Sequence, residues 1–185
     1  PEAAAFSIDG TLVVPVGDRV LAIDPAGKSR ALPPPPRPPR RMFLDTRELR
    51  VLLDDQILAT PLDRPAWQSI ARCDYTGIRG RLAEANADLA MLACPGSSSK
   101  LVIDGQSSSI AIDRRDAVAF APNRRVAVRR DMAIDVYDAH TTLVARREVI
   151  ATQVAITDDL VAYIADGTLV LWDPATNAIN ATQMR

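Results

Sequence analysis

The sequence contains few glycines, few aromatic residues, two cysteines and a single histidine, and each shortage excludes a class of protein. Eight glycines in 185 residues leave no glycine-rich loop that could cradle a phosphate. His140 has no accompanying nucleophile motif, and the acidic residues do not form the dense run of oxygen ligands that a calcium loop needs. The sequence therefore predicts no catalytic residue, no metal site and no cofactor.

Long apolar runs are also missing, since none approaches the roughly 18 to 20 residues of a membrane span. The first residues have neither the basic start nor the apolar core of a signal peptide. Only two of the 22 basic residues are lysines, and 19 of the 23 acidic residues are aspartates, a bias typical of GC-rich bacterial genes. We expect a cytoplasmic bacterial protein without a membrane partner and, because the chain starts at Pro1, a piece of a longer polypeptide.

The two cysteines, Cys73 and Cys94, show neither metal-ligand spacing nor a dithiol motif. We expect two buried thiols, because free cysteine behaves as a small apolar residue. A disulfide is the alternative.

The segment DGTLVLWDPATN (Asp166–Asn177) has the features of one β-strand between two turns, and similar segments recur. Three stretches share the order strand, turn, strand, turn, and a third strand that ends in Asp24, Asp138 or Asp173. They read AAAFSIDGTLVVPVGDRVLAIDPAGKSRAL, AVAFAPNRRVAVRRDMAIDVYDAHTTLVA and TQVAITDDLVAYIADGTLVLWDPATNAINA. A further turn and a weaker fourth strand follow in each, which predicts a repeated four-stranded unit.

The middle of the chain keeps the same rhythm. The strands expected there are Met42–Asp45, Leu49–Leu53, Gln56–Leu62, Trp67–Cys73, Arg81–Ala85, Leu89–Cys94, Leu101–Asp104 and Ser108–Asp113. The second strands of the five units start near Leu12, Leu49, Leu89, Val126 and Leu160, at spacings of 37, 40, 37 and 34 residues. Five units would thus occupy approximately residues 2–36, 41–75, 78–113, 116–149 and 151–185.

Several strands, such as LVAYIA and TLVLW, are apolar almost throughout, as expected where a sheet packs between two others. A four-stranded unit that recurs about every 40 residues is typical of a β-propeller blade. The patterns AVAFAPN…VAV…AIDVYD and VAITDDLVAYIADGTLVLWD resemble the WD-repeat family, and Trp172-Asp173 matches its defining dipeptide. The family's Gly-His dipeptide is absent from all units, so the hydrogen-bonded tetrad built on that histidine cannot form in the usual way.

The sequence therefore predicts an all-β fold, a divergent β-propeller of about five four-stranded blades. The chain is either a complete ring or part of a larger propeller. A β-sandwich is the competing fold, although its strands more often alternate apolar and polar residues. Locally, RLAEANADLAML could form a helix by propensity, whereas the repeat predicts a strand, a turn and a strand.

The run PPPPRPPRR (Pro33–Arg41) predicts a solvated polyproline II segment between the first two units. Its simplest role is a stiff connector. Alternatively, the spacing of Pro35, Pro38 and Arg40 suits a ligand for an aromatic-lined groove on another protein.

The resemblance and the architecture imply recognition rather than catalysis. We predict a non-catalytic interaction scaffold, or a sensor or regulatory module, whose partner is a protein or an adjoining effector domain. The candidate binding residues are Trp67, Tyr137, Arg114, Arg115, Arg124, Arg125, Arg129 and Arg130. The arginine doublets would gather on one rim if equivalent turns of successive blades meet there.

Two alternatives belong to other classes. A five-bladed propeller hydrolase acting on a carbohydrate would need two facing carboxylates, and only Asp45 and Glu84 offer them on the first strands. A nucleic-acid surface would use the arginine doublets, but acidic residues interleave with them and few aromatic residues are available for base stacking.

Overall fold

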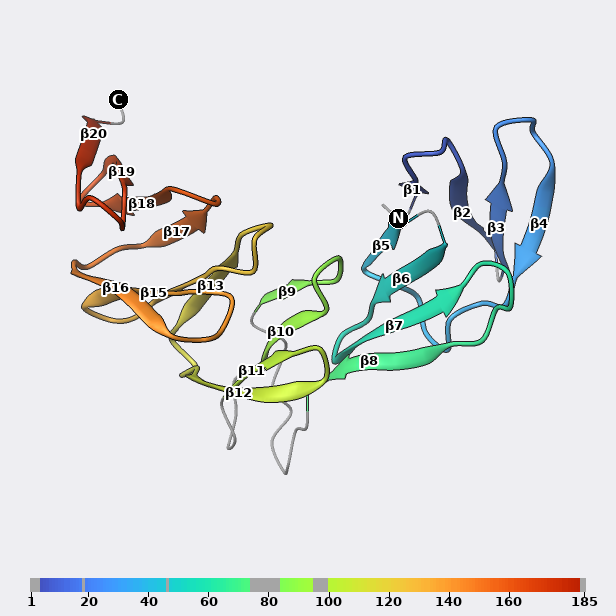
Figure 1. Ribbon diagram of the computed structural model, residues 1–185, viewed down its shortest axis with the longest axis horizontal. Helices are drawn as coiled ribbons and strands as arrows, with labels where there is room; N and C mark the ends of the chain where they lie inside the picture. The colour runs from blue at the N-terminus through green and yellow to red at the C-terminus, as the bar shows by residue number, and fades with distance from the viewer. Residues whose placement is uncertain (1–3, 18, 46, 74–83, 95–99, 184–185) are drawn as a thin grey trace. The chain divides into compact units, whose positions relative to one another are not determined.

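The computed structural model describes residues 4–17, 19–45, 47–73, 84–94 and 100–183. Within these ranges the protein is all-β: twenty strands form five antiparallel sheets of four strands, in chain order (Figure 1). The described residues contain no helix, and so none that is long and apolar enough to span a membrane. The prediction of repeated four-stranded units is confirmed.

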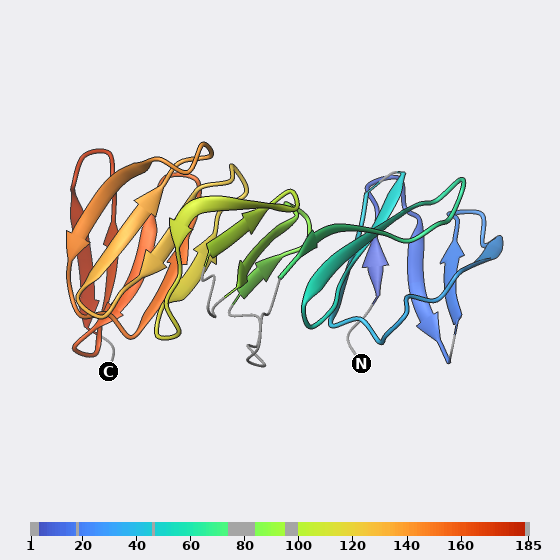
Figure 2. The same cartoon turned by 90° about the horizontal axis from the view of Figure 1, so that it is seen from below.

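Each sheet is an up-and-down meander, in which consecutive strands are hydrogen-bonded neighbours (Figure 2). The first sheet comprises β1 (Ala5–Phe6), β2 (Leu12–Val16), β3 (Arg19–Ile23) and β4 (Ser29–Leu32). The second comprises β5 (Arg41–Leu44), β6 (Glu48–Leu52), β7 (Gln56–Pro61) and β8 (Gln68–Arg72). The third comprises β9 (Glu84–Asn86), β10 (Met91–Cys94), β11 (Lys100–Ile103) and β12 (Gln106–Ala111). The fourth comprises β13 (Ala117–Phe120), β14 (Val126–Arg129), β15 (Ala133–Tyr137) and β16 (Leu143–Glu148). The fifth comprises β17 (Gln153–Ile156), β18 (Val161–Ala165), β19 (Thr168–Trp172) and β20 (Ile179–Gln183).

Turn chemistry sets the strand ends. Asp166 and Gly167, between β18 and β19, have φ values of 48° and 71°. Asp104 and Gly105, between β11 and β12, have φ values of 48° and 80°. Two successive positive φ values define the tight hairpin turn that Asp-Gly favours, so both dipeptides act as predicted from the sequence.

The segment with helical propensity forms a strand, a turn and a strand in its described part. β9 ends at Asn86, a turn covers residues 87–90, and β10 begins at Met91. Ala90 adopts a left-handed φ of 53°, which a helix could not accommodate. Residues 81–83 of the predicted strand Arg81–Ala85 lie outside the described part of the chain.

The first and second sheets share one apolar core. Val13 and Ala22 contribute from the first sheet, and Leu49 and Val51 from the second, each at most 3 % exposed. Because alternate strand residues point to opposite faces, Val20 and Ala22 of β3 both enter this core, as does Val13 of β2. These two sheets belong to one compact unit of the chain.

The fourth and fifth sheets share a second core and belong to the other compact unit, while the third sheet is divided between the units. Ile134 and Val136 of β15 meet Val161 and Trp172 of the fifth sheet. Trp172 is 1 % exposed and donates its indole N–H to Asn177 Oδ1 at 3.0 Å. The WD dipeptide thus supplies a core side chain.

The expectation of two free thiols is wrong. Cys73 and Cys94 are both disulfide-bonded, and the described residues include no free cysteine. Sequence spacing carries no signal for this pairing, because a disulfide depends on how close the folded chain brings the two Cα atoms.

Candidate interaction surface

Arg130 lies at the centre of a network of charged side chains at one end of the fourth sheet. Its guanidinium donates to Asp135 Oδ2 at 3.1 Å, to the Ala111 carbonyl at 2.9 Å and to the Tyr137 hydroxyl at 3.2 Å. It also donates to Asp116 Oδ2. The side chains of Asp116 and Asp135 are only 4 % and 6 % exposed. Because a buried carboxylate is costly unless it is paired, these groups stabilise one another only as a set.

A second guanidinium completes the surroundings of Asp135. Strand pairing places Arg146 of β16 beside Asp135 of β15, and Arg146 Nη1 donates to Asp135 Oδ1 at 3.1 Å. Arg146 Nε donates to Glu148 Oε1 at 2.7 Å. Since the Arg146 side chain is half exposed, water screens its pair with Glu148, whereas Asp135 is held inside the protein from both sides.

The network keeps its cations charged. Burial alone would lower the pKa of Arg130, but the hydrogen bonds to Tyr137 and Asp135 and the charge of Asp116 outweigh it and raise that pKa. The pKa of Arg146 is raised mainly by its hydrogen bond to Glu148. Both guanidinium groups therefore act as fixed positive charges.

A hollow of about 580 Å³ opens beside this network. Its lining residues define what we call the arginine end: Asp113, Arg115, Asp116, Arg130, Asp131, Met132, Ala133 and Arg146. Met132, in the turn between β14 and β15, is 67 % exposed, and Ile150, just after β16, is 66 % exposed. The Val149 N–H donates to the Met132 carbonyl at 2.9 Å, so Ile150 directly follows a residue that is hydrogen-bonded to the turn between β14 and β15.

The arginine doublets do not form one patch, because successive strand residues point to opposite faces. Arg129 and Arg147 both pair in register with Ile134, which is buried against the fifth sheet. Arg147 Nε donates to the Tyr163 hydroxyl at 2.7 Å, and its guanidinium lies 5.9 Å from the Trp172 ring centroid. Arg130 and Arg146, which are the sequence neighbours of these two arginines, belong to the arginine end.

Arg129 and Arg125 each donate a hydrogen bond from the fourth sheet to a backbone carbonyl near the fifth. Arg129 Nη1 donates to the Ala151 carbonyl at 3.3 Å, in the segment that leads into β17. Arg125 Nη1 donates to the Asp158 carbonyl at 2.6 Å, in the turn between β17 and β18. These contacts stabilise the packing of the two sheets.

Arg124 and Arg125 precede β14, whereas Arg129 and Arg130 lie at its end, so the two doublets occupy opposite ends of one strand. The expectation of a common rim is therefore wrong for Arg124 and Arg125. A strand of about four residues separates the two turns by more than 10 Å, which a single patch of side chains on one face does not span.

Arg114 and Arg115 lie in the segment between β12 and β13, at the arginine end, and both are exposed. The Arg115 side chain is 82 % exposed, with Nη1 3.7 Å from Asp131 Oδ2. Tyr137 is half-buried and its hydroxyl joins the Arg130 network, and its role in binding a partner stays a prediction.

Trp67 is committed within its own compact unit. Its indole N–H donates to the carbonyls of Pro33 and Pro34, at 3.0 and 3.1 Å, and its ring packs on the shared core of the first two sheets. The residue holds the proline-rich segment, much as tryptophans of other proteins hold polyproline II ligands. A role of Trp67 in binding a partner stays a prediction.

Ion pairs hold the proline-rich segment at its other end. Arg40 Nε lies 2.5 Å from Asp54 Oδ1, and Arg37 pairs with Asp55. Both aspartates belong to the turn between β6 and β7. Because the arginine of the groove-binding spacing is paired within the chain, the segment is a connector fixed against the second sheet.

The carboxylates expected of a hydrolase are not brought together in either described hollow. Asp45 lies in the turn after β5 and lines neither, and the Glu84 side chain lies outside the described residues. His140 is exposed in the turn after β15, where its backbone N–H donates to Asp138 Oδ1 at 2.9 Å. The described residues contain no cluster of His, Cys, Asp or Glu that could hold a metal ion.

Sequence reasoning missed Asp116, Asp135 and Met132. One signal was present: Asp135 interrupts the apolar run AIDVY, and a charge inside a strand of a buried sheet requires a partner. Met132 carried no such signal, because its exposure depends on the geometry of the turn.

No protein-family model matches the chain, and no curated protein matches it. Solved structures do match it over nearly its whole length. A chain of a mitotic checkpoint complex aligns with 98 % of this chain and 63 % of its own length, with a TM-score of 0.54 and 14 % identity. The WD40 domain of SCAP from fission yeast aligns with 98 % of this chain and 55 % of its own length, with a TM-score of 0.52 and 12 % identity.

PorZ of Porphyromonas gingivalis, a bacterial surface component of the type-IX secretion system, aligns with 97 % of this chain and 27 % of its own length, with a TM-score of 0.56 and 10 % identity. The chain thus spans less than two-thirds of each of these proteins. At such identities the likeness concerns the fold alone. The chain folds into four-stranded units of the β-propeller type, and the predicted resemblance to WD-repeat proteins is confirmed at that level.

Proposed function

We propose that the protein is a non-catalytic interaction module and that its arginine end docks a protein segment carrying an apolar side chain flanked by acidic residues. The observation that carries this proposal is Met132, a large apolar residue that is 67 % exposed at the tip of a turn held by buried ion pairs. Exposed apolar side chains on a rigid frame are typical anchors of protein interfaces, because the backbone that carries them needs no further ordering when the partner binds.

The charges at the arginine end support acidic flanks on the partner. Arg115 is 82 % exposed, and its pair with Asp131 is long and solvated, so a partner carboxylate can replace Asp131 at little cost. Arg114 is exposed beside it. Guanidinium groups bind carboxylates through two parallel hydrogen bonds, which gives such a contact direction as well as strength.

The carboxylates at the arginine end support a non-catalytic role. Asp116 and Asp135 accept hydrogen bonds from guanidinium groups that are themselves fixed in place. A general acid or base instead needs to reach the substrate and exchange a proton near the working pH. The likeness to a chain of a mitotic checkpoint complex, an assembly of proteins, fits an interaction role as well.

We also infer that the module works in an oxidising compartment. Both cysteines are disulfide-bonded, and reducing agents of the cytoplasm keep most protein thiols free. The cytoplasmic location expected from the sequence is therefore not part of this proposal. Trapping the thiols with an alkylating agent in intact cells of the source organism tests it, and two alkylated cysteines would contradict it.

The test of the docking surface uses a photo-crosslinking amino acid at position 132 in the full-length protein, expressed in its source organism. Crosslinked protein is then purified and its affinity measured for the wild type, Met132→Asp and Arg115→Glu. We expect each substitution to weaken binding about tenfold or more, as for anchor residues of other interfaces.

Leu143→Asp is the matched control, because Leu143 is 48 % exposed at the opposite end of the same sheet. It should leave the affinity unchanged. Equal losses for Leu143→Asp and Met132→Asp, or a partner indifferent to both Met132→Asp and Arg115→Glu, would contradict the proposed surface. A crosslinked nucleic acid in place of a protein would favour the nucleic-acid alternative.

A further inference from the structure

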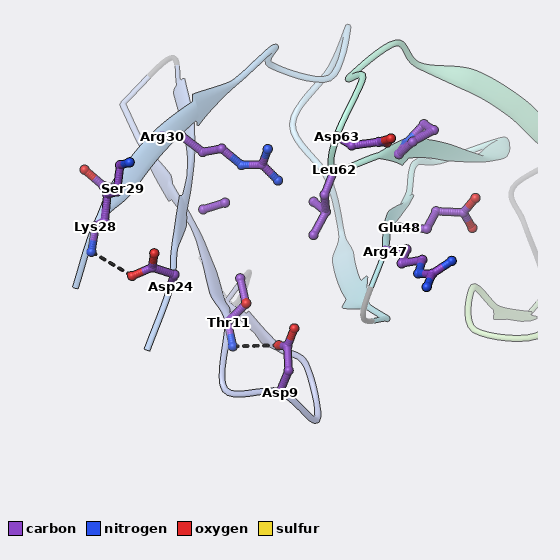
Figure 3. Close-up of a pocket in the computed structure, with 12 residues that line it drawn as sticks. Asp9, Thr11, Asp24, Lys28, Ser29, Arg30, Arg47, Glu48, Leu62 and Asp63 are labelled. Atoms are coloured by element: carbon purple, nitrogen blue, oxygen red, sulfur yellow. Dashed lines mark hydrogen bonds between the residues drawn. The ribbon is translucent and has the colours of Figure 1, made fainter. Parts of the chain in front are cut away.

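A hollow of about 820 Å³ opens between the first and second sheets, within one compact unit (Figure 3). One wall is formed by the turns that follow β1 and β3, and the other by the turn before β6 and the end of β7. The apolar part of the lining includes Ala22 and Leu62, which belong to the shared core. The volume lies in the range of small-ligand sites.

Arg30 extends into this space from β4. It pairs in register with Ala22, so its side chain lies on the face that packs against the second sheet. Two residues further along β4, Leu32 is buried in that core. Figure 3 shows the Arg30 guanidinium directed from β4 towards Leu62 on the opposite wall.

No described residue accepts a hydrogen bond from the three cationic side chains that line the hollow. The side chains of Arg30, Arg47 and Lys28 make no hydrogen bond or ion pair among the described residues. Five donor N–H groups on each guanidinium and three on the ammonium are thus available to a ligand.

Two carboxylates of the hollow, those of Asp24 and Asp63, each accept a backbone hydrogen bond through one oxygen. Asp24 Oδ1 accepts the Lys28 backbone N–H at 2.8 Å, and Asp63 Oδ1 accepts the Arg64 backbone N–H at 2.9 Å. The second oxygen of each carboxylate has no donor among the described residues. Asp9 and Glu48 also line the hollow, which brings the carboxylates to four against three cations, and the Glu48 carboxylate is already paired with Arg50 Nε at 2.6 Å.

We propose that this hollow binds a small zwitterionic ligand of the amino-acid or short-peptide class, with its carboxylate on Arg30 and its ammonium on the open oxygen of Asp63, next to Leu62 on the wall that Arg30 points towards. Free donors and free acceptors line the same space, so a ligand that carries both charges satisfies both. A purely anionic ligand would be repelled by the four carboxylates, and a purely cationic one would leave the guanidinium groups without acceptors. This inference is independent of the docking surface proposed for the arginine end.

The experiment compares three peptides by isothermal titration calorimetry on the whole chain. Triglycine carries both charges, N-acetyl-triglycine only the carboxylate, and triglycinamide only the ammonium. We expect triglycine to bind with a Kd of about 1 mM or tighter, and each blocked peptide to bind about tenfold more weakly.

Arg30→Gln should weaken triglycine binding about tenfold as well. Arg19→Gln is the matched control, because Arg19 is exposed on β3 and alternates with the residues that face the hollow. Equal spectra by circular dichroism and equal Tm values establish that both variants fold. The proposal is overturned if triglycine fails to bind at about 20 mM, if a blocked peptide binds as well as triglycine, or if the two variants behave alike.

Discussion

Replacing Asp135 with alanine should lower the free energy of unfolding by about 3 kcal/mol. The substitution removes the carboxylate that accepts hydrogen bonds from Arg130 and Arg146, both at 3.1 Å. It leaves two guanidinium groups at the arginine end with one acceptor fewer. The prediction tests whether this network stabilises the fourth sheet or contributes nothing measurable to the free energy of unfolding.

The magnitude follows from what each arginine retains. Arg146 is half exposed and keeps Glu148, so its share is about 0 to 1 kcal/mol. Arg130 is 24 % exposed and keeps Asp116, but one hydrogen bond to a charged acceptor, worth about 1.5 to 3 kcal/mol, is lost. The sum is about 1.5 to 4 kcal/mol, centred near 3 kcal/mol, which lies at the low end of the roughly 3 to 5 kcal/mol expected when a buried charge loses its only partner.

Urea unfolding followed by tryptophan fluorescence measures the change, and the Tm should fall by about 6 to 12 °C. A double-mutant cycle with Arg130→Met should give a coupling energy of about 2 kcal/mol. Asp131→Ala is the control, because Asp131 is 67 % exposed and should lose less than about 0.5 kcal/mol. A loss for Asp135→Ala no larger than for this control would refute the reasoning.

Two further predictions concern contacts that were not predicted from the sequence. Trp67→Phe keeps one aromatic ring but removes the N–H that reaches the carbonyls of Pro33 and Pro34, together with part of the packed indole, so the variant should lose about 1 kcal/mol of stability or more, measured by urea unfolding. Proteolysis of the proline-rich segment should also become faster, and unchanged stability and cleavage would speak against this role. Reduction of the disulfide that involves Cys73 and Cys94 should cost about 2 to 4 kcal/mol. Alkylation of the denatured, unreduced protein should modify no cysteine, and labelling at both would show that the bond is absent.

The rhythm of the fold was readable because it depends on local chemistry. Asp-Gly dipeptides and apolar runs act within a few residues of one another, so the hairpin at Asp166-Gly167 and the strand starts near Leu49 and Val126 emerged from the sequence. The segment around Leu89 was predicted from the repeat and not from local chemistry, since tertiary pairing in the third sheet overrides its helical propensity.

The candidate site was only partly readable because it depends on which face of a strand each side chain takes. Arg129 and Arg130 are adjacent in the sequence, yet one contacts the segment before β17 and the other a pair of buried carboxylates. Two adjacent arginines in a strand therefore point to opposite faces of the sheet and make different contacts, and they do not form one patch of positive charge. The disulfide was unreadable for a related reason, since residues far apart in the chain carry no mark of their distance in space.

The same arginines suggest how the fourth and fifth sheets pack without the histidine-based tetrad that WD repeats usually carry. The core between these sheets combines the large side chains of Tyr163 and Trp172 with two alanines, Ala127 and Ala151, and each buried alanine contributes less than a leucine would. Directional contacts from Arg129 and Arg147 add to this modest apolar burial, and the aliphatic parts of their side chains cover apolar surface as well. Arg147→Met keeps that apolar cover but removes the bond to the Tyr163 hydroxyl. The variant therefore separates the contribution of apolar burial from that of the hydrogen bond. An unchanged free energy of unfolding would assign the packing to burial alone, whereas a decrease of about 1 to 2 kcal/mol would assign a share to the hydrogen bond.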